Sequence, residues 1–137
     1  MKNLLKTNVY DVDEAIIVAG SCLKRMQPKA FDMLKEFGYE IYELCLEESH
    51  INMAVSKLCG MLARVKIRKI IFATVDNSPH CIQMHYIENE IRKIMKLDNL
   101  ETEHYIAVDE KLVKIENQTI KLSKSLNDLQ NLIKDKG

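Results

Sequence analysis

The sequence predicts one α/β domain of a three-layer, Rossmann-like or flavodoxin-like type, with a mostly parallel sheet, a C-terminal β-hairpin and a final helix. Short apolar runs that suit buried strands alternate along the chain with stretches whose apolar residues recur at helical spacing. The 137 residues contain no low-complexity tract or Gly/Ser/Pro-rich linker, and this length suits one ordinary domain. We therefore expect a single domain over residues 1–137, in which residues 110–137 form a hairpin–helix extension or a dimer arm.

Four segments are expected to form parallel strands. Ala15–Ala19 is a continuous apolar run that ends at Gly20, which is typical of a strand buried on both faces. Tyr39–Cys45 alternates in character and predicts a strand nearer the sheet edge. Lys69–Val75 predicts another buried strand, and His104–Val108 predicts the fourth.

The stretches between these strands have helical periodicity. A short helix is expected from Pro28 to Phe37, because proline suits a first helical turn and the apolar residues recur at helical spacing. Ser49 is a suitable N-cap for a longer helix over residues 51–65. The third helix is placed at about residues 79–97, because Ser78 and Pro79 are favoured at the N-cap and the first helical position.

The C-terminal segment differs from this alternation. Lys111–Ile115 and Thr119–Leu122 resemble two short strands around Glu116–Gln118, and they predict a hairpin. A final helix is expected to carry Leu126, Leu129, Leu132 and Ile133. The hairpin is expected to extend the sheet or to pair with another subunit.

Charge and hydropathy exclude several classes of partner. Twenty Lys and Arg residues balance twenty Asp and Glu residues, so no net field attracts nucleic acid. The apolar run Ala15–Gly20 is far shorter than the roughly 20 residues that span a bilayer, and residues 1–5 lack the apolar core of a signal peptide. A cytoplasmic protein without a nucleic-acid or membrane partner is expected, and its four widely spaced cysteines are expected to be reduced thiols.

The functional residues are expected in the loops after the strands. The carboxyl ends of parallel strands meet at one sheet edge, and ligands of open α/β sheets bind there. The loops 21–25, 45–50 and 76–81 follow the first three strands. They bring to one edge three of the four cysteines and two of the four histidines, namely Cys22, Cys45, His50, His80 and Cys81.

Cys81 is the first choice for a reactive group. It would occupy the third position of the helix that Ser78 begins, where free N–H groups and the helix dipole favour a thiolate. We therefore expect it to be the most reactive thiol, titrating below the roughly 8.5 of a free cysteine. His85 lies four residues on and would share a helix face with Cys81, so the two could offer ligands to one metal ion. Asp76 could orient a histidine.

Packing roles compete with these functional roles. Cysteine is among the most buried residue types, so Cys59, inside a helix beside Leu58, is expected in the core and away from the site. Cys22 and Cys45 suit packing and function about equally. The chain has neither a Walker motif nor a three-glycine dinucleotide loop, so NAD and ATP are not indicated, and flavin is a minor alternative.

One stretch has a resemblance to a known family. Cys45 follows the second predicted strand, and Pro79-His80-Cys81 and His85-Tyr86-Ile87-Glu88 fall at the third helix. From Cys45 to about Val108 the chain resembles the iron-sulfur delta subunit of methyl-viologen-reducing hydrogenases, although that family's paired cysteines are reduced here to Cys22 and its cysteine before His-Tyr is Met84. The resemblance implies an electron-transfer accessory domain with an iron-sulfur centre that docks on a redox partner.

Three functions follow from these observations. The first is a metal-binding or iron-sulfur redox accessory domain with an iron-sulfur cluster or zinc, whose ligands are drawn from Cys22, Cys45, His80, Cys81 and His85, with His50 as a further candidate. The second is a small enzyme that uses Cys81 or Cys22 as nucleophile and His80 or His85 as general base, with Asp76 to orient a histidine and the free N–H groups of the helix that Ser78 begins as an anion site. The third is a noncatalytic ligand-binding or assembly module that forms a homo-oligomer through its C-terminal hairpin and helix.

Overall fold

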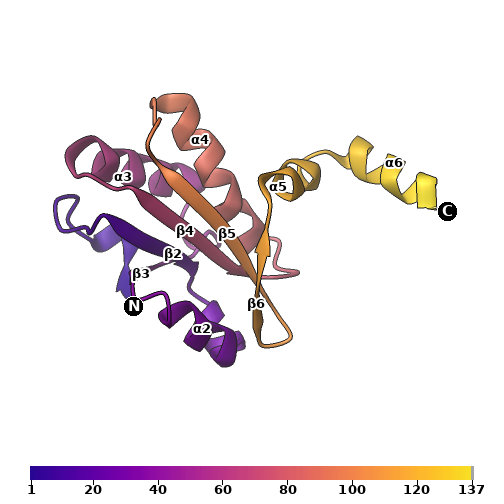
Figure 1. Ribbon diagram of the computed structural model, residues 1–137, viewed down its shortest axis with the longest axis horizontal. Helices are drawn as coiled ribbons and strands as arrows, with labels where there is room; N and C mark the ends of the chain where they lie inside the picture. The colour runs from indigo at the N-terminus through magenta and orange to yellow at the C-terminus, as the bar shows by residue number, and fades with distance from the viewer. Residues whose placement is uncertain (137) are drawn as a thin grey trace.

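The computed structural model describes residues 1–136 and contains one six-stranded sheet in the order β1-β3-β2-β4-β5-β6 (Figure 1). The strands are β1 (Lys2–Asn3), β2 (Ala15–Gly20), β3 (Glu40–Leu44), β4 (Lys69–Val75), β5 (Glu101–Val108) and β6 (Lys111–Ile115). Every neighbouring pair is parallel except β5 and β6, which are antiparallel. The predicted α/β class with a mostly parallel sheet is therefore confirmed.

Helices cover both faces of this sheet. The helices of the described residues are η1 (Leu4–Lys6), α1 (Leu23–Met26), α2 (Pro28–Lys35), α3 (Ile51–Arg64), η2 (Cys81–Tyr86), α4 (Ile87–Ile94), α5 (Asn117–Ser123) and α6 (Leu126–Lys136). Helix α2 lies on one side of the sheet, and α3 and α4 lie on the other (Figure 1). The molecule thus has three layers, and α6 projects away from them (Figure 1).

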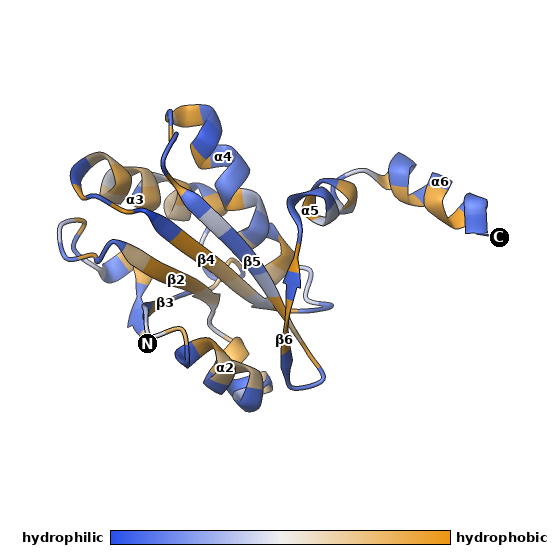
Figure 2. Ribbon diagram, viewed as in Figure 1, coloured by the Kyte–Doolittle hydropathy of each residue, from blue (hydrophilic) through white to orange (hydrophobic). Residues whose placement is uncertain are grey.

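The core lies on both sides of β2 and β4. Alternate residues of a strand point to opposite faces, so Ile16 and Val18 join the core cluster under α3 and α4, whereas Ile17 joins the cluster under α1 and α2. Both strands are coloured largely as hydrophobic in Figure 2, and the polar side chains in their sequences are Lys69 and Thr74. Full burial of each large aliphatic side chain contributes about 1.5–3 kcal/mol, which explains why these continuous apolar runs form the central strands.

The order of the strands fixes where a ligand crevice forms. From β2 the chain crosses through α1 and α2 to β3 on one side of β2, and it then returns through α3 to β4 on the other side. The connections after β2 and β4 therefore diverge to opposite faces. Such a switch point leaves a crevice outside the carboxyl ends of the two strands.

The C-terminal hairpin is built from different strands than the sequence predicts. Its antiparallel partners are β5 and β6, which are joined by Asp109 and Glu110 with φ of 49° and 65°. The prediction of a strand at Thr119–Leu122 is wrong, because this segment lies in α5 and buries Ile120. The hydrogen bond from the Lys29 N–H to the Glu110 carboxylate, 2.9 Å long, ties the hairpin tip to α2.

Other element boundaries also differ from the predictions. The single helix predicted at residues 79–97 is instead a turn at Pro79 and His80, followed by η2 and then α4, which ends at Ile94. Asn77 has a positive φ of 63°, which redirects the chain before the helix can begin. The N-cap of α3 is His50, not Ser49, because the His50 ring accepts the N–H of Asn52 at 3.1 Å.

Two further features complete the fold. β5 begins three residues before the predicted strand, and the two-residue β1 was not predicted. Helix α6 has no buried residue and exposes Leu126, Leu132 and Ile133. Within residues 1–136, no helix combines the length and apolar character needed to cross a membrane.

We expect the central strands to determine stability. Ile71 in β4 is fully buried, so Ile71→Ala should lower the free energy of unfolding by about 2–5 kcal/mol. Val113 in β6 is 44% exposed, and Val113→Ala should change it by less than about 1 kcal/mol. Urea unfolding measures both values, and equal losses would contradict the assigned core.

Candidate functional site

A crevice of about 520 Å³ lies at the carboxyl ends of β2, β3 and β4. It is lined by Ser21, Cys22, Arg25, Leu44, Cys45, Leu46, Glu47, Glu48, Ser78, His80, Cys81 and Met84. We call it the switch-point crevice. The predicted convergence of Cys22, Cys45, His80 and Cys81 on one crevice is confirmed.

Two of the cysteines are in direct contact. The Cys22 and Cys81 sulfur atoms lie 3.6 Å apart and share a hydrogen bond. Cys22 follows β2 and precedes α1, whereas Cys81 is the first residue of η2. A β-carbon on Gly20 would come within 3.4 Å of the Cys81 sulfur, so this sulfur packs directly against the backbone at the end of β2.

The local fold fixes Cys81 more firmly than Cys22. The Ser78 hydroxyl accepts the N–H of Cys81 at 3.2 Å. Cys81 is only 8% exposed, while Cys22 is half-buried. The expected position of Cys81, third in an α-helix, is wrong because η2 is a six-residue 3₁₀ helix. Cys81 therefore does not lie in the first turn of an α-helix, where the helix dipole would favour its thiolate.

The environment of Cys22 favours the protonated thiol. Burial, the hydrogen bond with Cys81 and the charge of a Cys81 thiolate together raise the pKa of Cys22 to about 11. The charge of Cys45 adds to this effect, which places the third cysteine within electrostatic reach. At neutral pH Cys22 keeps its proton and can donate it to the Cys81 sulfur.

The remaining polar side chains of the crevice carry both signs of charge. Arg25 follows Cys22 in α1, and Glu47 and Glu48 follow Cys45. His80 precedes Cys81 and lines the same wall. A zinc or iron-sulfur centre needs about four protein ligands around one point. Across residues 1–136 no three His, Cys, Asp or Glu side chains are arranged to hold a metal ion, so the donor set as placed does not fit such a centre.

Several predicted site residues lie outside the crevice. His85 bonds through Nε2 to the Thr74 hydroxyl at 2.7 Å and through Nδ1 to His104 at 2.9 Å, so neither ring nitrogen is free to join Cys81. Asp76 is not among the partners that orient His85. His50 caps α3. Cys59 is part of α3 and packs against the core, as predicted.

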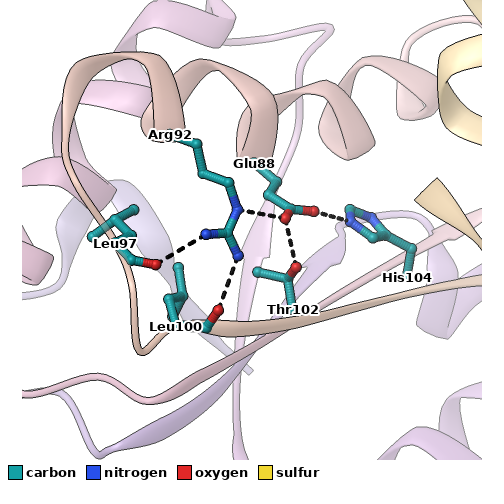
Figure 3. Close-up of polar contacts among 6 residues, drawn as sticks. All are labelled: Glu88, Arg92, Leu97, Leu100, Thr102 and His104. Atoms are coloured by element: carbon teal, nitrogen blue, oxygen red, sulfur yellow. Dashed lines mark hydrogen bonds and ion pairs between the residues drawn. The ribbon is translucent and has the colours of Figure 1, made fainter. Parts of the chain in front are cut away.

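A buried polar cluster between the strands β4 and β5 and the helices η2 and α4 was not predicted. Thr74, His85, His104 and Glu88 form a continuous chain of hydrogen bonds, which we call the histidine relay. The His104 Nε2 bonds to the Glu88 carboxylate at 2.6 Å (Figure 3). The signal in the sequence was Glu88 on the same predicted helix as His85, but the place of His104 opposite them depends on the strand pairing of β4 with β5.

Glu88 is the anchor of this relay. Thr102 donates to its carboxylate at 2.6 Å and Arg92 at 2.7 Å, while the Arg92 guanidinium also donates to the carbonyls of Leu97 and Leu100 (Figure 3). Burial would raise the pKa of Glu88, but hydrogen bonds from His104, Thr102 and Arg92 outweigh it and lower this pKa to about 2. Glu88 is therefore a carboxylate at all ordinary pH values.

His85 is held in its neutral form. Burial, and then the charge of His104, lower the pKa of His85 to about 3. The ring is only 3% exposed. Its two hydrogen bonds satisfy both nitrogens without a charge.

A second cavity, of about 430 Å³, lies on the other side of the loop after β4. We call it the β4 cavity. Its lining residues are Thr74, Val75, Asp76, Asn77, Ser78, Pro79, Ile82, His85, Ile106, Ile115, Thr119, Ile120 and Ser123. Ser78 lines both this cavity and the switch-point crevice.

The sheet order and the crevice together define a doubly wound α/β protein with its candidate site at the switch point. A family model described as a Rossmann-like domain matches residues 11–136. The chain belongs to this Rossmann-like domain family. No curated protein and no solved structure matches the chain.

The contact between the two thiols predicts a change in acidity when one is removed. Burial is the largest cause of the raised pKa of Cys22 and remains in Cys81→Ala, but the hydrogen bond and the charge of Cys81 are removed, so this pKa should fall below about 11. The pH dependence of iodoacetamide alkylation, followed at Cys22 by peptide mass, measures it. Cys59→Ala is the matched control and should leave the Cys22 profile unchanged. An unshifted profile in Cys81→Ala would contradict the contact.

The relay predicts that acid destabilises the fold. The pKa of Glu88 is about 2 and that of His85 about 3 in the folded state, against roughly 4.3 and 6.5 for free side chains. At acidic pH the unfolded chain therefore binds more protons than the folded chain, and the free energy of unfolding decreases as pH falls. The contribution of His85 begins to be lost below about pH 6.5, and that of Glu88 below about pH 4.3.

Glu88→Gln tests this linkage. This variant lacks the buried carboxylate, and its free energy of unfolding should be lower by about 3 kcal/mol at pH 7. The difference should become smaller as the pH approaches 2. Glu90→Gln on the exposed side of α4 should change stability by less than about 1 kcal/mol. Urea unfolding between pH 3 and 7 measures both, and a pH-independent cost for Glu88→Gln would count against the assigned role of the carboxylate.

Proposed function

We propose that this chain is a small redox accessory domain whose reactive centre is the Cys22–Cys81 thiol pair. The observation that carries the proposal is the 3.6 Å contact between their sulfur atoms. A disulfide bond is about 2.05 Å long, so the sulfurs need to approach by only about 1.5 Å to become bonded. Both residues lie in the switch-point crevice, where open α/β sheets place their reactive groups.

The proposed step is thiol–disulfide exchange with a disulfide on a partner protein. The more exposed Cys22 attacks as a thiolate and forms a mixed disulfide, and the first partner sulfur leaves and takes up a proton. Cys81 then loses its proton and attacks the Cys22 sulfur, which releases the second partner thiol. Two electrons pass to the partner disulfide, and the Cys22–Cys81 disulfide remains.

The acidity of Cys22 controls the rate of this step. Because its pKa is raised to about 11 by burial and by Cys81, the reactive thiolate is scarce at neutral pH. Small disulfides should therefore react slowly with Cys22 at neutral pH, and the reaction should become faster as the pH rises toward 11. Efficient exchange at neutral pH requires a partner that docks and holds its disulfide against the crevice.

A metal-loaded form of the same crevice is the second candidate. Two thiolates on one tetrahedral zinc ion lie about 3.8 Å apart, since each Zn–S bond is about 2.3 Å. The separation of Cys22 and Cys81 is close to this value. Cys45 and His80 line the same crevice and are the side chains that would have to move to complete a ligand set for zinc or an iron-sulfur cluster.

Thiol mapping of the anaerobically purified chain tests the proposal. Native protein treated with glutathione disulfide at pH 9 should lose two thiols and yield a Cys22–Cys81 linked peptide. Cys59→Ser and Cys45→Ser should form the same link, whereas Cys22→Ser and Cys81→Ser should form none.

Two outcomes would overturn the dithiol proposal. The first is that Cys22 and Cys81 stay reduced in the native protein under conditions that oxidise the urea-unfolded chain. The second is stoichiometric zinc, or iron with acid-labile sulfide, that is lost from Cys22→Ser and Cys45→Ser, which would assign the crevice to the metal-loaded form.

A further inference from the structure

The β4 cavity has a polar floor and largely apolar walls. Its floor contains Thr74 and His85, which are 2% and 3% exposed and belong to the histidine relay. Most of the exposed lining surface is apolar and comes from side chains such as Ile82, Ile106 and Ile120, and further polar groups are added by Asp76, Asn77, Ser78, Thr119 and Ser123. A cavity of about 430 Å³ with a few convergent polar groups has the size and character of a small-molecule site.

The relay determines which hydrogen-bonding group the floor offers. The Glu88 carboxylate only accepts, so the Nε2 of His104 carries a proton and donates it (Figure 3). Between the two facing Nδ1 atoms of His85 and His104 there is one proton. It resides on one ring or the other, and this choice sets the direction of the hydrogen bond to Thr74.

In the first arrangement the shared proton is on His85. The Nε2 of neutral His85 then carries a lone pair, and the Thr74 hydroxyl donates to it. The Thr74 oxygen keeps its own lone pairs and can accept a hydrogen bond from a ligand. In the second arrangement His104 carries protons on both nitrogens, and His85 donates to Thr74 instead.

The two arrangements select different ligands. A ligand with an O–H or N–H donor suits the first arrangement and leaves the proton count of the relay unchanged. A ligand that only accepts needs the Thr74 proton, which requires the second arrangement and the uptake of one proton.

The charges around the cavity favour a cationic donor. Asp76 is the one charged side chain in the lining of this cavity, whereas Lys and Arg are absent from that lining. Further charged groups line the neighbouring cavity together with His85, namely Glu88 and Arg92 of α4, Lys121 of α5 and Lys124 at the C-cap of α5. Arg92 is occupied by Glu88 and two backbone carbonyls, and Lys124 lies over the Tyr86 ring at 4.6 Å.

We propose that the β4 cavity is a second binding site, for a small and largely apolar amine. Its apolar body would pack among Ile82, Ile106 and Ile120, and its ammonium group would donate to the Thr74 hydroxyl and pair with Asp76. The lining of this site includes neither Cys22 nor Cys81. The relay preorganises it, because Glu88 holds His104, His104 holds His85, and His85 holds the Thr74 hydroxyl.

A set of matched probes tests the predicted chemistry. Benzylamine, benzyl alcohol, toluene and benzoate share one ring and differ in the polar group. Titration of the full chain at pH 8, followed by backbone amide and histidine ring ¹⁵N signals, gives a dissociation constant for each. Benzylamine should bind at least tenfold more tightly than toluene, benzyl alcohol should fall between them, and benzoate should not bind.

Variants of the lining residues separate the polar contacts from the apolar walls. Thr74→Val should reduce the preference for benzylamine over toluene, while Thr119→Val in the same lining should preserve it in full. Asp76→Asn should weaken the binding of benzylamine about tenfold and leave the binding of toluene unchanged. Asp98 is exposed, and Asp98→Asn should alter the binding of neither probe. Since Thr74 is buried, the amide spectrum serves as the folding control, and Asp76→Asn tests the proposal even if Thr74→Val does not fold.

The proposal fails if toluene binds as tightly as benzylamine, if benzoate binds more tightly, or if no probe binds. It also fails if the benzylamine shifts map to Cys22 and Cys45 rather than to Thr74, Ile106 and Ile120. The thiol proposal is untouched by any of these results, because none of the probes reacts with cysteine.

Discussion

The arrangement of β2 between β3 and β4 is the constraint on which the rest of the molecule depends. Because β2 pairs in parallel with both neighbours, three loops that are far apart in the sequence begin at the same edge of the sheet. This pairing is maintained by the burial of continuous apolar strands on both faces, not by any polar contact. The contact between Cys22 and Cys81 is thus a consequence of topology, because the two crossovers from β2 to β3 and from β3 to β4 lie between these residues, which are 59 positions apart in the sequence.

The histidine relay makes a different contribution on the face covered by α4. It replaces apolar packing by a chain of hydrogen bonds in which every buried ring nitrogen has a partner. A buried carboxylate is costly unless it is fully bonded, and here three side chains donate to Glu88. The relay therefore ties α4 to β5 and at the same time fixes the Thr74 hydroxyl at the floor of the β4 cavity.

The strands were predictable and the local turns were not. Ala15–Ala19 and Lys69–Val75 were apparent because continuous apolar runs need two covered faces, and their carboxyl ends then located Cys22 and Cys81. The helix at Pro79 was mispredicted, because Asn77 adopts a positive φ that composition does not reveal. His85 was assigned to the wrong site, since its partner His104 comes from a strand whose register follows only from the three-dimensional pairing.

A trivalent arsenical distinguishes a close Cys22–Cys81 thiol pair in the native fold from two separate thiols. Such a reagent is held tightly only when two thiols can bind the same arsenic atom. We expect the folded, reduced chain to bind one equivalent, Cys59→Ser to bind it equally, and Cys22→Ser and Cys81→Ser not to bind it. Unaltered binding by Cys22→Ser or Cys81→Ser, or no binding by the native chain, would show that these two thiols do not form a pair.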